Sequence, residues 1–219
     1  MTATSTLSFD RLPAEIPVFP LPRVILLPDV QLPLNIFEPR YLAMVEAALA
    51  GSRLIGMIQP QEDGARPALF KTGCAGRIVS FSETDDGRYQ ITLKGVCRFD
   101  VAQELPAPPG GFRRVMPDWS PYAGDFSPSA ETSICRDAIM NTLHNYFDKM
   151  NMFCDKWEKM QEISCDKLIS TLSVVCPFDT DEKQALLEAR TLADRARILQ
   201  AIIENAIKNH DSSTKPCCH

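Results

Sequence analysis

The stretch YQITLKGVCRFDV, residues 89–101, has the clearest structural pattern in the chain. Its first half alternates apolar Tyr89, Ile91 and Leu93 with polar residues, which predicts a half-buried β-strand. Gly95 interrupts the alternation, and the apolar positions continue after it in a changed register. A strand that bends at a glycine is typical of a small sheet that curls into a barrel, so we place this strand at the centre of the predicted fold.

Further strands precede it. Asp85-Asp86-Gly87 predicts a hairpin turn that joins residues 77–81 to this strand, because glycine accepts the positive φ that such turns need. Residues 54–58 (LIGMI) form a short apolar run that indicates a buried strand. Residues 30–36 alternate as well, but Pro33 cannot donate to a ladder. That strand is therefore expected to lie at an edge of the sheet or to carry a bulge.

One helix interrupts these strands. Pro39 suits the first helical position, apolar residues then recur at helical spacing, and Gly51 is placed to end the helix. A last strand is expected at 113–116.

The composition changes after residue 129, because no glycine follows and the apolar spacing becomes helical. Ser164 is a candidate cap, and Asp179 with Glu182 and Thr191 with Asp194 resemble capping boxes. Strands followed by helices predict an α+β fold. The predicted organisation is a flexible arm (1–14), a β-barrel subdomain (15–118), a linker (119–129), a helical subdomain (130–209) and a disordered tail (210–219).

Composition restricts the function classes. The chain has 219 residues and a net charge of -5, and it lacks the basic stripe that nucleic acids require. No apolar run is long enough for a membrane span, and the N-terminus has no signal-peptide pattern, so we expect a cytoplasmic location. Eight cysteines in a chain of this kind are expected to be mostly buried, reduced thiols.

Motifs of catalysis are absent from the sequence. There is no Gly-Lys dipeptide for a Walker A loop, no G-x-S-x-G, no H-E-x-x-H and no C-x-x-C. His144 with a cysteine could form a nucleophile–base pair, although a helix-surface histidine explains it better. Cys217-Cys218-His219 could hold a metal, although a terminal tail explains it better. We predict that the chain is not an enzyme and that it has no cofactor and no metal site. The alternative is that it is a cysteine-dependent hydrolase.

Six segments form a distinctive set of motifs: 16–22 (IPVFPLP), 27–29 (LPD), 32–34 (LPL), 37–41 (FEPRY), 73–78 (GCAGRI) and 93–99 (LKGVCRF). Together they resemble the N-terminal, substrate-binding domain of the bacterial-type Lon protease family (ATP-dependent protease La). Their combination and order over some 85 residues are more specific than any one motif. The resemblance extends more weakly to about residue 209.

The resemblance implies a PUA-like, partly closed β-barrel with one helix, followed by a C-terminal α-helical bundle. It also implies a non-catalytic module that recognises unfolded or degron-bearing proteins in protein quality control. Its partners would be such clients, with a protease or chaperone that receives them. The ATPase and Ser-Lys peptidase activities of Lon are not expected, because the sequence of 219 residues has no Walker A loop and no room for these two domains after the region of resemblance. PUA-like barrels can bind RNA, which leaves RNA binding as another alternative.

A candidate polypeptide-binding groove lies near the predicted strand–helix junction. Its apolar residues could hold an extended chain, and its charged residues could steer the peptide backbone or cap the helix. The alternative is that Leu34, Phe37 and Tyr41 are core residues. The candidate residues are Leu26, Leu34, Phe37, Glu38, Arg40 and Tyr41.

Overall fold

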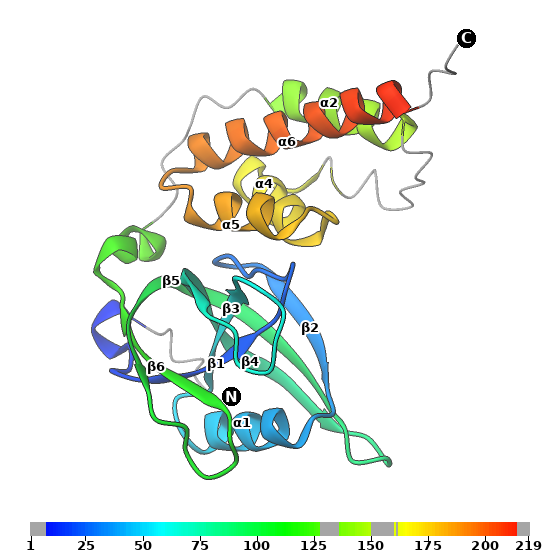
Figure 1. Cartoon of the computed structure of the whole chain (residues 1–219). Helices are drawn as coiled ribbons and strands as arrows, with labels where there is room; N and C mark the ends of the chain where they lie inside the picture. Colours follow the sequence, from blue (N-terminus) through cyan, green and yellow to red (C-terminus); the bar gives the residue numbers. More distant parts are fainter. Residues whose placement is uncertain (1–7, 128–135, 150–159, 161, 214–219) are drawn as a thin grey trace.

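The structure, a computed structural model, describes residues 8–127, 136–149, 160 and 162–213. It has an α+β fold in which six strands and one helix precede a group of helices (Figure 1). The strands are β1 (Ile16–Pro20), β2 (Gln31–Ile36), β3 (Leu54–Pro60), β4 (Leu69–Glu83), β5 (Tyr89–Leu105) and β6 (Arg113–Asp118). The α-helices are α1 (Pro39–Ala50), α2 (Arg136–Lys149), α4 (Cys165–Val175), α5 (Thr180–Glu188) and α6 (Leu192–Ser213), and two 3₁₀ helices are η1 (Phe9–Arg11) and η2 (Ser120–Phe126).

The sheet closes on itself. Its strand order is β2-β5-β4-β3-β1-β6, and β5 also pairs with β6, so five strands form a ring. Strand β2 lies outside this ring and pairs with the first half of β5, from Gln31 opposite Lys94 to Ile36 opposite Tyr89. The edge position predicted from Pro33 is therefore confirmed, and so is the hairpin, where Gly87 has a φ of 76°.

Strand β5 belongs to both parts of the sheet because it bends at Gly95. Ala75 pairs with Cys97 and Gly76 pairs with Gly95, so Val96 is the extra residue of a bulge. The chain segment 27–30 crosses β5 at this point: the Gly95 amide donates to the Val30 carbonyl at 2.9 Å. A Cβ atom on Gly95 would overlap the Leu27 carbonyl, so only glycine permits this crossing.

Helix α1 lies at one end of the barrel, and the later helices lie at the other (Figure 1). Pro39 is at its start and Gly51 follows its last residue, as predicted. Its inner face packs on the barrel through four buried residues, Tyr41, Met44, Val45 and Ala48.

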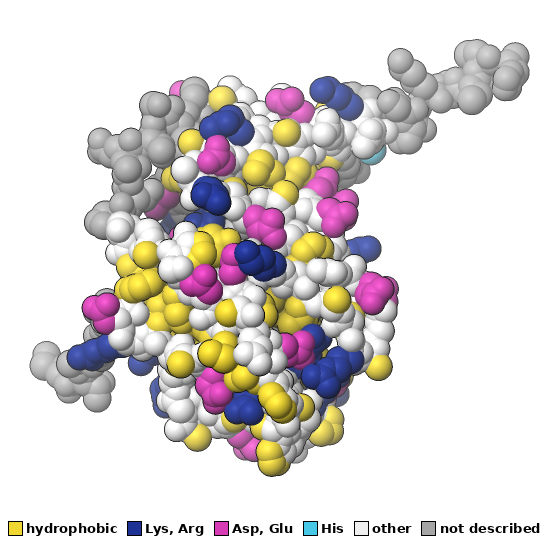
Figure 2. Space-filling model, turned by 60° about the vertical axis from the view of Figure 1, so that its left-hand side comes forward, with side chains coloured by type: hydrophobic (Ala, Val, Ile, Leu, Met, Phe, Trp, Pro, Cys, Tyr) yellow, Lys and Arg dark blue, Asp and Glu magenta, His cyan; other side chains and the backbone are white. Residues whose placement is uncertain are grey.

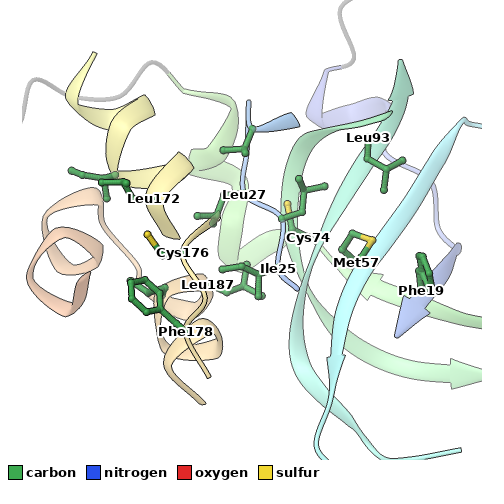
Figure 3. Close-up of a cluster of buried hydrophobic side chains, with 14 of the residues drawn as sticks. Phe19, Ile25, Leu27, Met57, Cys74, Leu93, Leu172, Cys176, Phe178 and Leu187 are labelled. Carbon is green, nitrogen blue, oxygen red and sulfur yellow. The ribbon is translucent and has the colours of Figure 1, made fainter. Parts of the chain in front are cut away.

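The helices share a hydrophobic core with the barrel. In Figure 3, Leu172, Cys176, Phe178 and Leu187 of the helical part face Ile25 and Leu27, beyond which Cys74, Met57, Leu93 and Phe19 continue the cluster. A second, smaller cluster inside the ring contains Phe99 and six neighbours. The capping box of Asp179 and Glu182 is present, and the Thr191 hydroxyl caps the Asp194 amide at 3.1 Å.

Two segments differ from the expectation of irregular, loose chain. In the predicted arm, η1 places Phe9 edge-on to Phe126 with ring centroids 5.9 Å apart, and the Pro13 carbonyl accepts a hydrogen bond from the Trp119 indole. In the predicted linker, residues 120–126 form η2. Aromatic contacts between distant segments order both stretches, and local sequence periodicity does not reveal such contacts.

Other elements are longer than predicted. Strand β4 begins at Leu69 rather than at 77, and helix α6 continues to Ser213, so the first residues of the predicted disordered tail (210–219) are helical. Val175 on α4 is 64% exposed although it is apolar. No helix in the described part of the chain is both long and apolar enough to cross a membrane.

Candidate functional site

A groove with a volume of about 340 Å³ opens beside β2 and the start of α1. The loop after β3 and the residues before β6 form its other walls. Its apolar walls combine four aromatic rings with prolines and aliphatic side chains. The apolar lining residues are Phe19, Pro20, Leu21, Pro22, Leu34, Ile36, Phe37, Tyr41, Pro60, Ala65, Pro67 and Phe112.

Five of the six residues predicted for the candidate site line this groove: Leu34, Phe37, Glu38, Arg40 and Tyr41. Phe37 is 61% exposed, although it is a large apolar residue. Tyr41 is buried, and its ring lies 4.3 Å from that of Phe19 between centroids. The groove therefore has an exposed aromatic residue at its rim and fixed aromatic residues at its base.

Leu26, the sixth candidate, was wrongly assigned to the groove. Its side chain is fully buried and does not line this surface. Its Cδ2 atom lies 2.5 Å from the position that a Cβ atom on Gly76 would occupy, so Leu26 fills the space that this glycine leaves in the core. Leu26 is therefore a core residue and not part of the candidate site.

The two charged candidates bind each other. Arg40 donates from Nε to Glu38 Oε2 at 3.0 Å, and its Nη2 lies 2.8 Å from the same oxygen. The Glu38 side chain does not cap α1, although Glu38 holds the N-cap position. The Arg40 guanidinium also lies 4.6 Å from the Tyr41 ring centroid. Burial raises the pKa of Tyr41, and the positive charge of Arg40 opposes that rise.

Sequence reasoning missed Arg113, which lines the opposite wall of the groove. Its guanidinium donates two hydrogen bonds to the Glu104 carboxylate, at 2.8 and 2.6 Å, and a third to the Pro67 carbonyl at 2.7 Å. The bond from Arg113 holds the pKa of Glu104 below its usual value. Arg113 therefore fixes the loop before β4 to β6. The pair Arg113-Arg114 was the one available signal, and it is too short a basic cluster to be assigned from sequence.

Three of the four described thiols are buried and poorly suited to nucleophilic catalysis. Burial raises the pKa of Cys97 to about 12 and that of Cys176 to about 11, and it also raises the pKa of Cys74. His144, the histidine of the alternative hydrolase, lies on the surface of α2 with 62% of its side chain exposed, and its Nε2 is 3.4 Å from Asp148. Cys135, Cys154 and the tail Cys217-Cys218-His219 lie outside the described residues.

Charges of both signs are mixed over the surface shown in Figure 2. Lysine and arginine side chains on this face are interspersed with acidic and hydrophobic ones and do not form a continuous basic stripe. This distribution agrees with the net charge of -5 and gives no support to binding of an extended nucleic acid.

The known proteins that are similar to this chain include Lon proteases. The chain is 23% identical over 192 residues to a Lon protease of Flavobacterium johnsoniae, with 85% of this chain and 23% of that protein covered. It is 27% identical over 210 residues to a Lon protease of Parabacteroides distasonis, with 90% of this chain and 24% of that protein covered. The chain thus spans about a quarter of the length of these relatives.

Two solved structures share the fold. A Lon N-terminal domain protein from Xanthomonas campestris matches with a TM-score of 0.61 and 22% identity, covering 85% of this chain and 97% of that one. The N-terminal domain of a Mycobacterium avium complex Lon protease matches with a TM-score of 0.60 and 17% identity, covering 87% and 98%. The family model for the ATP-dependent protease La (LON) substrate-binding domain matches residues 15–205. The chain therefore belongs to the LON substrate-binding domain family, and its match is to that domain and not to a catalytic one.

Proposed function

We propose that the chain is a non-catalytic module that binds exposed apolar segments of unfolded or degron-bearing proteins through the groove beside β2. The observation that carries the proposal is the position of Phe37. A phenylalanine that is 61% exposed stands at the rim of a groove whose base contains Phe19 and Tyr41. Exposed apolar surface beside a concave apolar wall is a common feature of polypeptide-binding sites.

The charges around the groove suit a peptide backbone. Glu38, Glu62 and Asp63 line it together with Arg40 and Arg113, so both amide donors and carbonyl acceptors of a bound chain would find partners. A mixed polar rim around an apolar floor resembles the usual arrangement of a protein interface. Membership of the substrate-binding domain family supports a protein ligand over a small molecule.

We further propose that the chain acts as an adaptor that presents its clients to a protease or chaperone. In this proposal the five-stranded ring is a PUA-like barrel, and the helices after residue 130 form a separate bundle subdomain. The shared hydrophobic core between the two parts would keep the groove in a fixed position relative to a partner held by the helices.

The test is direct binding of the purified chain to a reduced, permanently unfolded protein and to the folded form of that protein, followed by fluorescence anisotropy. We expect selective binding of the unfolded form. Phe37→Ala should weaken it by about 1–2 kcal/mol, or roughly 5- to 30-fold, as loss of an aromatic contact typically does.

Val175→Ala is the matched control, because Val175 is an exposed apolar residue on α4, 64% accessible and distant from the groove. It should bind the unfolded protein as the wild type does. Equal binding of folded and unfolded forms, or equal losses in both variants, would contradict the groove as the binding site.

A further inference from the structure

A second concave surface lies between the barrel and the helices. It is a cleft of about 800 Å³, and its lining residues come from the segment 28–31, β5, η2, α4 and the first residues of α6. Unlike the groove beside β2, its lining is rich in charged and hydroxyl side chains. The charged members are Asp29, Lys94, Arg98, Asp125, Asp166, Lys167, Arg190 and Arg195.

Positive charge exceeds negative charge in this cleft. Five basic and three acidic side chains give a formal excess of two positive charges, in a chain whose net charge is -5. Two of the acids are neutralised locally, because Lys94 binds Asp29 at 2.9 Å and Arg98 binds Asp125 at 2.7 Å. Asp166 is then the one remaining acid among the described lining residues, beside Lys167, Arg190 and Arg195.

Arg195 is the decisive residue, because it is only 6% exposed. Its Nε donates to the Leu186 carbonyl at 2.9 Å, and its Nη2 lies 3.5 Å from the Ala189 carbonyl. Within the described part of the chain, its Nη1 donates to no protein group, yet this atom is not sealed from solvent. A buried guanidinium usually has a carboxylate partner, and no carboxylate in the described residues binds Arg195.

The surroundings of Arg195 make its charge costly. Burial and the nearby charge of Arg98 lower the pKa of Arg195 to about 10. Carbonyl groups at the end of α5 offset part of this cost through the negative end of the helix dipole. The remaining donor, Nη1 of Arg195, faces a polar cleft. An anion bound there would offset the rest of the cost of burying this positive charge.

The first turn of α4 adds further donors. Ser164 occupies the N-cap but its side chain makes no capping hydrogen bond, and Ser164, Asp166 and Lys167 all line the cleft. The amide groups at a helix start attract anions. Arg190 and Lys167 have no ion-pair partner among the described residues, so both are available to a ligand.

We propose that this cleft binds an oxyanion of the phosphate class. The residues that hold it are Arg195, through Nη1, Arg190, and Lys167, which lies in the first turn of α4. The guanidinium groups supply charge-assisted hydrogen bonds, and the helix start supplies backbone amides. The site is distinct from the polypeptide groove, so it does not depend on the function proposed for that groove.

The test is isothermal titration calorimetry of the full chain with pyrophosphate and, separately, with citrate, at constant ionic strength set with sodium chloride. The double variant Lys167→Gln/Arg190→Gln removes two cations whose side chains make no hydrogen bond or ion pair with the described residues. The matched control is Arg53→Gln/Lys208→Gln, which removes the same charge at exposed positions outside the cleft. Thermal melting of each variant shows whether it is folded.

We expect saturable binding of one pyrophosphate per chain. It should weaken by about tenfold or more in the cleft variant, and by no more than about twofold in the control, as for loss of a distant screened charge. Arg195→Lys, which keeps the charge but loses the planar fork, should also weaken binding if it melts as the wild type does. Absence of saturable heat, or equal weakening in the cleft variant and the control, would overturn the proposal. Tighter binding of citrate than of pyrophosphate would overturn the assignment to the phosphate class.

Discussion

The guanidinium of Arg98 and the carboxylate of Asp125 form a two-point ion pair, with Nε–Oδ2 and Nη2–Oδ1 distances of 3.0 and 2.7 Å. Both side chains are more than nine-tenths buried. Arg98 Nη1 also donates to the Leu187 and Ala189 carbonyls at the end of α5, at 3.1 and 2.6 Å. One side chain on β5 therefore joins the barrel to η2 and to the helical part.

Asp125→Asn should lower the free energy of unfolding by about 3–5 kcal/mol, because it leaves the Arg98 charge buried without its counter-ion. Urea denaturation monitored by circular dichroism measures the change. Arg197→Gln is the control, since its pair with Asp194 is largely solvent-exposed. It should cost less than about 1 kcal/mol. Similar losses in both variants would show that the buried pair does not hold the two parts together.

The role of Arg98 could not be predicted from the sequence. A polar residue in an alternating strand is expected to face solvent, but Arg98 is buried, and the bulge at Val96 shifts the register of the strand just before it. Its carboxylate partner lies 27 residues later in a segment without periodicity. Long-range ion pairs of this kind leave no local sequence signal, whereas the edge strand with Pro33 and the turn at Gly87 follow from local backbone chemistry.

The residues of the candidate site, like the strands, were predictable where they follow from local sequence. The sequence placed Phe37, Glu38, Arg40 and Tyr41 together because they are neighbours in the chain, and Leu34 followed from strand alternation. Leu26 was misplaced because its burial depends on the space above Gly76, a contact with a distant strand. Strand β4 was predicted to begin eight residues too late because Gly73 and Gly76 weaken the strand pattern of its first half, where they permit close packing against Phe99 and Leu26.

Gly95→Ala should be destabilising by about 3 kcal/mol, at the upper end of the usual cost of overpacking, because the added methyl group would overlap the Leu27 carbonyl of the crossing segment. A backbone atom cannot move aside as a side chain can. The free energy of unfolding in urea measures the effect. In Gly124→Ala the new methyl group meets no atom within 4 Å, so this variant should stay within about 0.5 kcal/mol of the wild type. A neutral Gly95→Ala would mean that the crossing can relax.

Tyr41→Ala and Phe37→Ala should differ in stability although both residues line the groove. Tyr41 is buried against Phe19, so its truncation should cost about 3–5 kcal/mol, as for other large buried aromatic residues. Phe37 is 61% exposed, and its truncation should change stability by no more than about 0.5 kcal/mol. Thermal unfolding of both variants under the same conditions makes the comparison. If Phe37→Ala melts as the wild type does, a loss of client binding in that variant reflects the groove and not a loss of folding.

Lys183 should give the chain a distinctive alkaline stability profile. Its ammonium group is buried, donates to the Ser173 and Val174 carbonyls at 2.8 and 2.6 Å, and has its pKa lowered to about 8 by desolvation. The unfolded chain, with a lysine pKa near its usual value of about 10.4, then binds more protons than the folded chain between pH 8 and 10.4. The contribution of Lys183 to folding therefore becomes more favourable as the pH rises through this window, by up to about 3 kcal/mol.

Lys183→Met removes this contribution, so the stability of the variant relative to the wild type should fall as the pH rises from 8 to about 10.4. Urea unfolding of both proteins at several pH values measures the difference. The comparison cancels the titration of Cys97, which both proteins share and which opposes folding at alkaline pH because its pKa is raised to about 12. Lys208→Met, at an exposed position on α6, should show a constant difference over the same range. A constant difference for Lys183→Met as well would show that the buried lysine keeps an ordinary pKa, and that its carbonyl partners fully replace the water it loses.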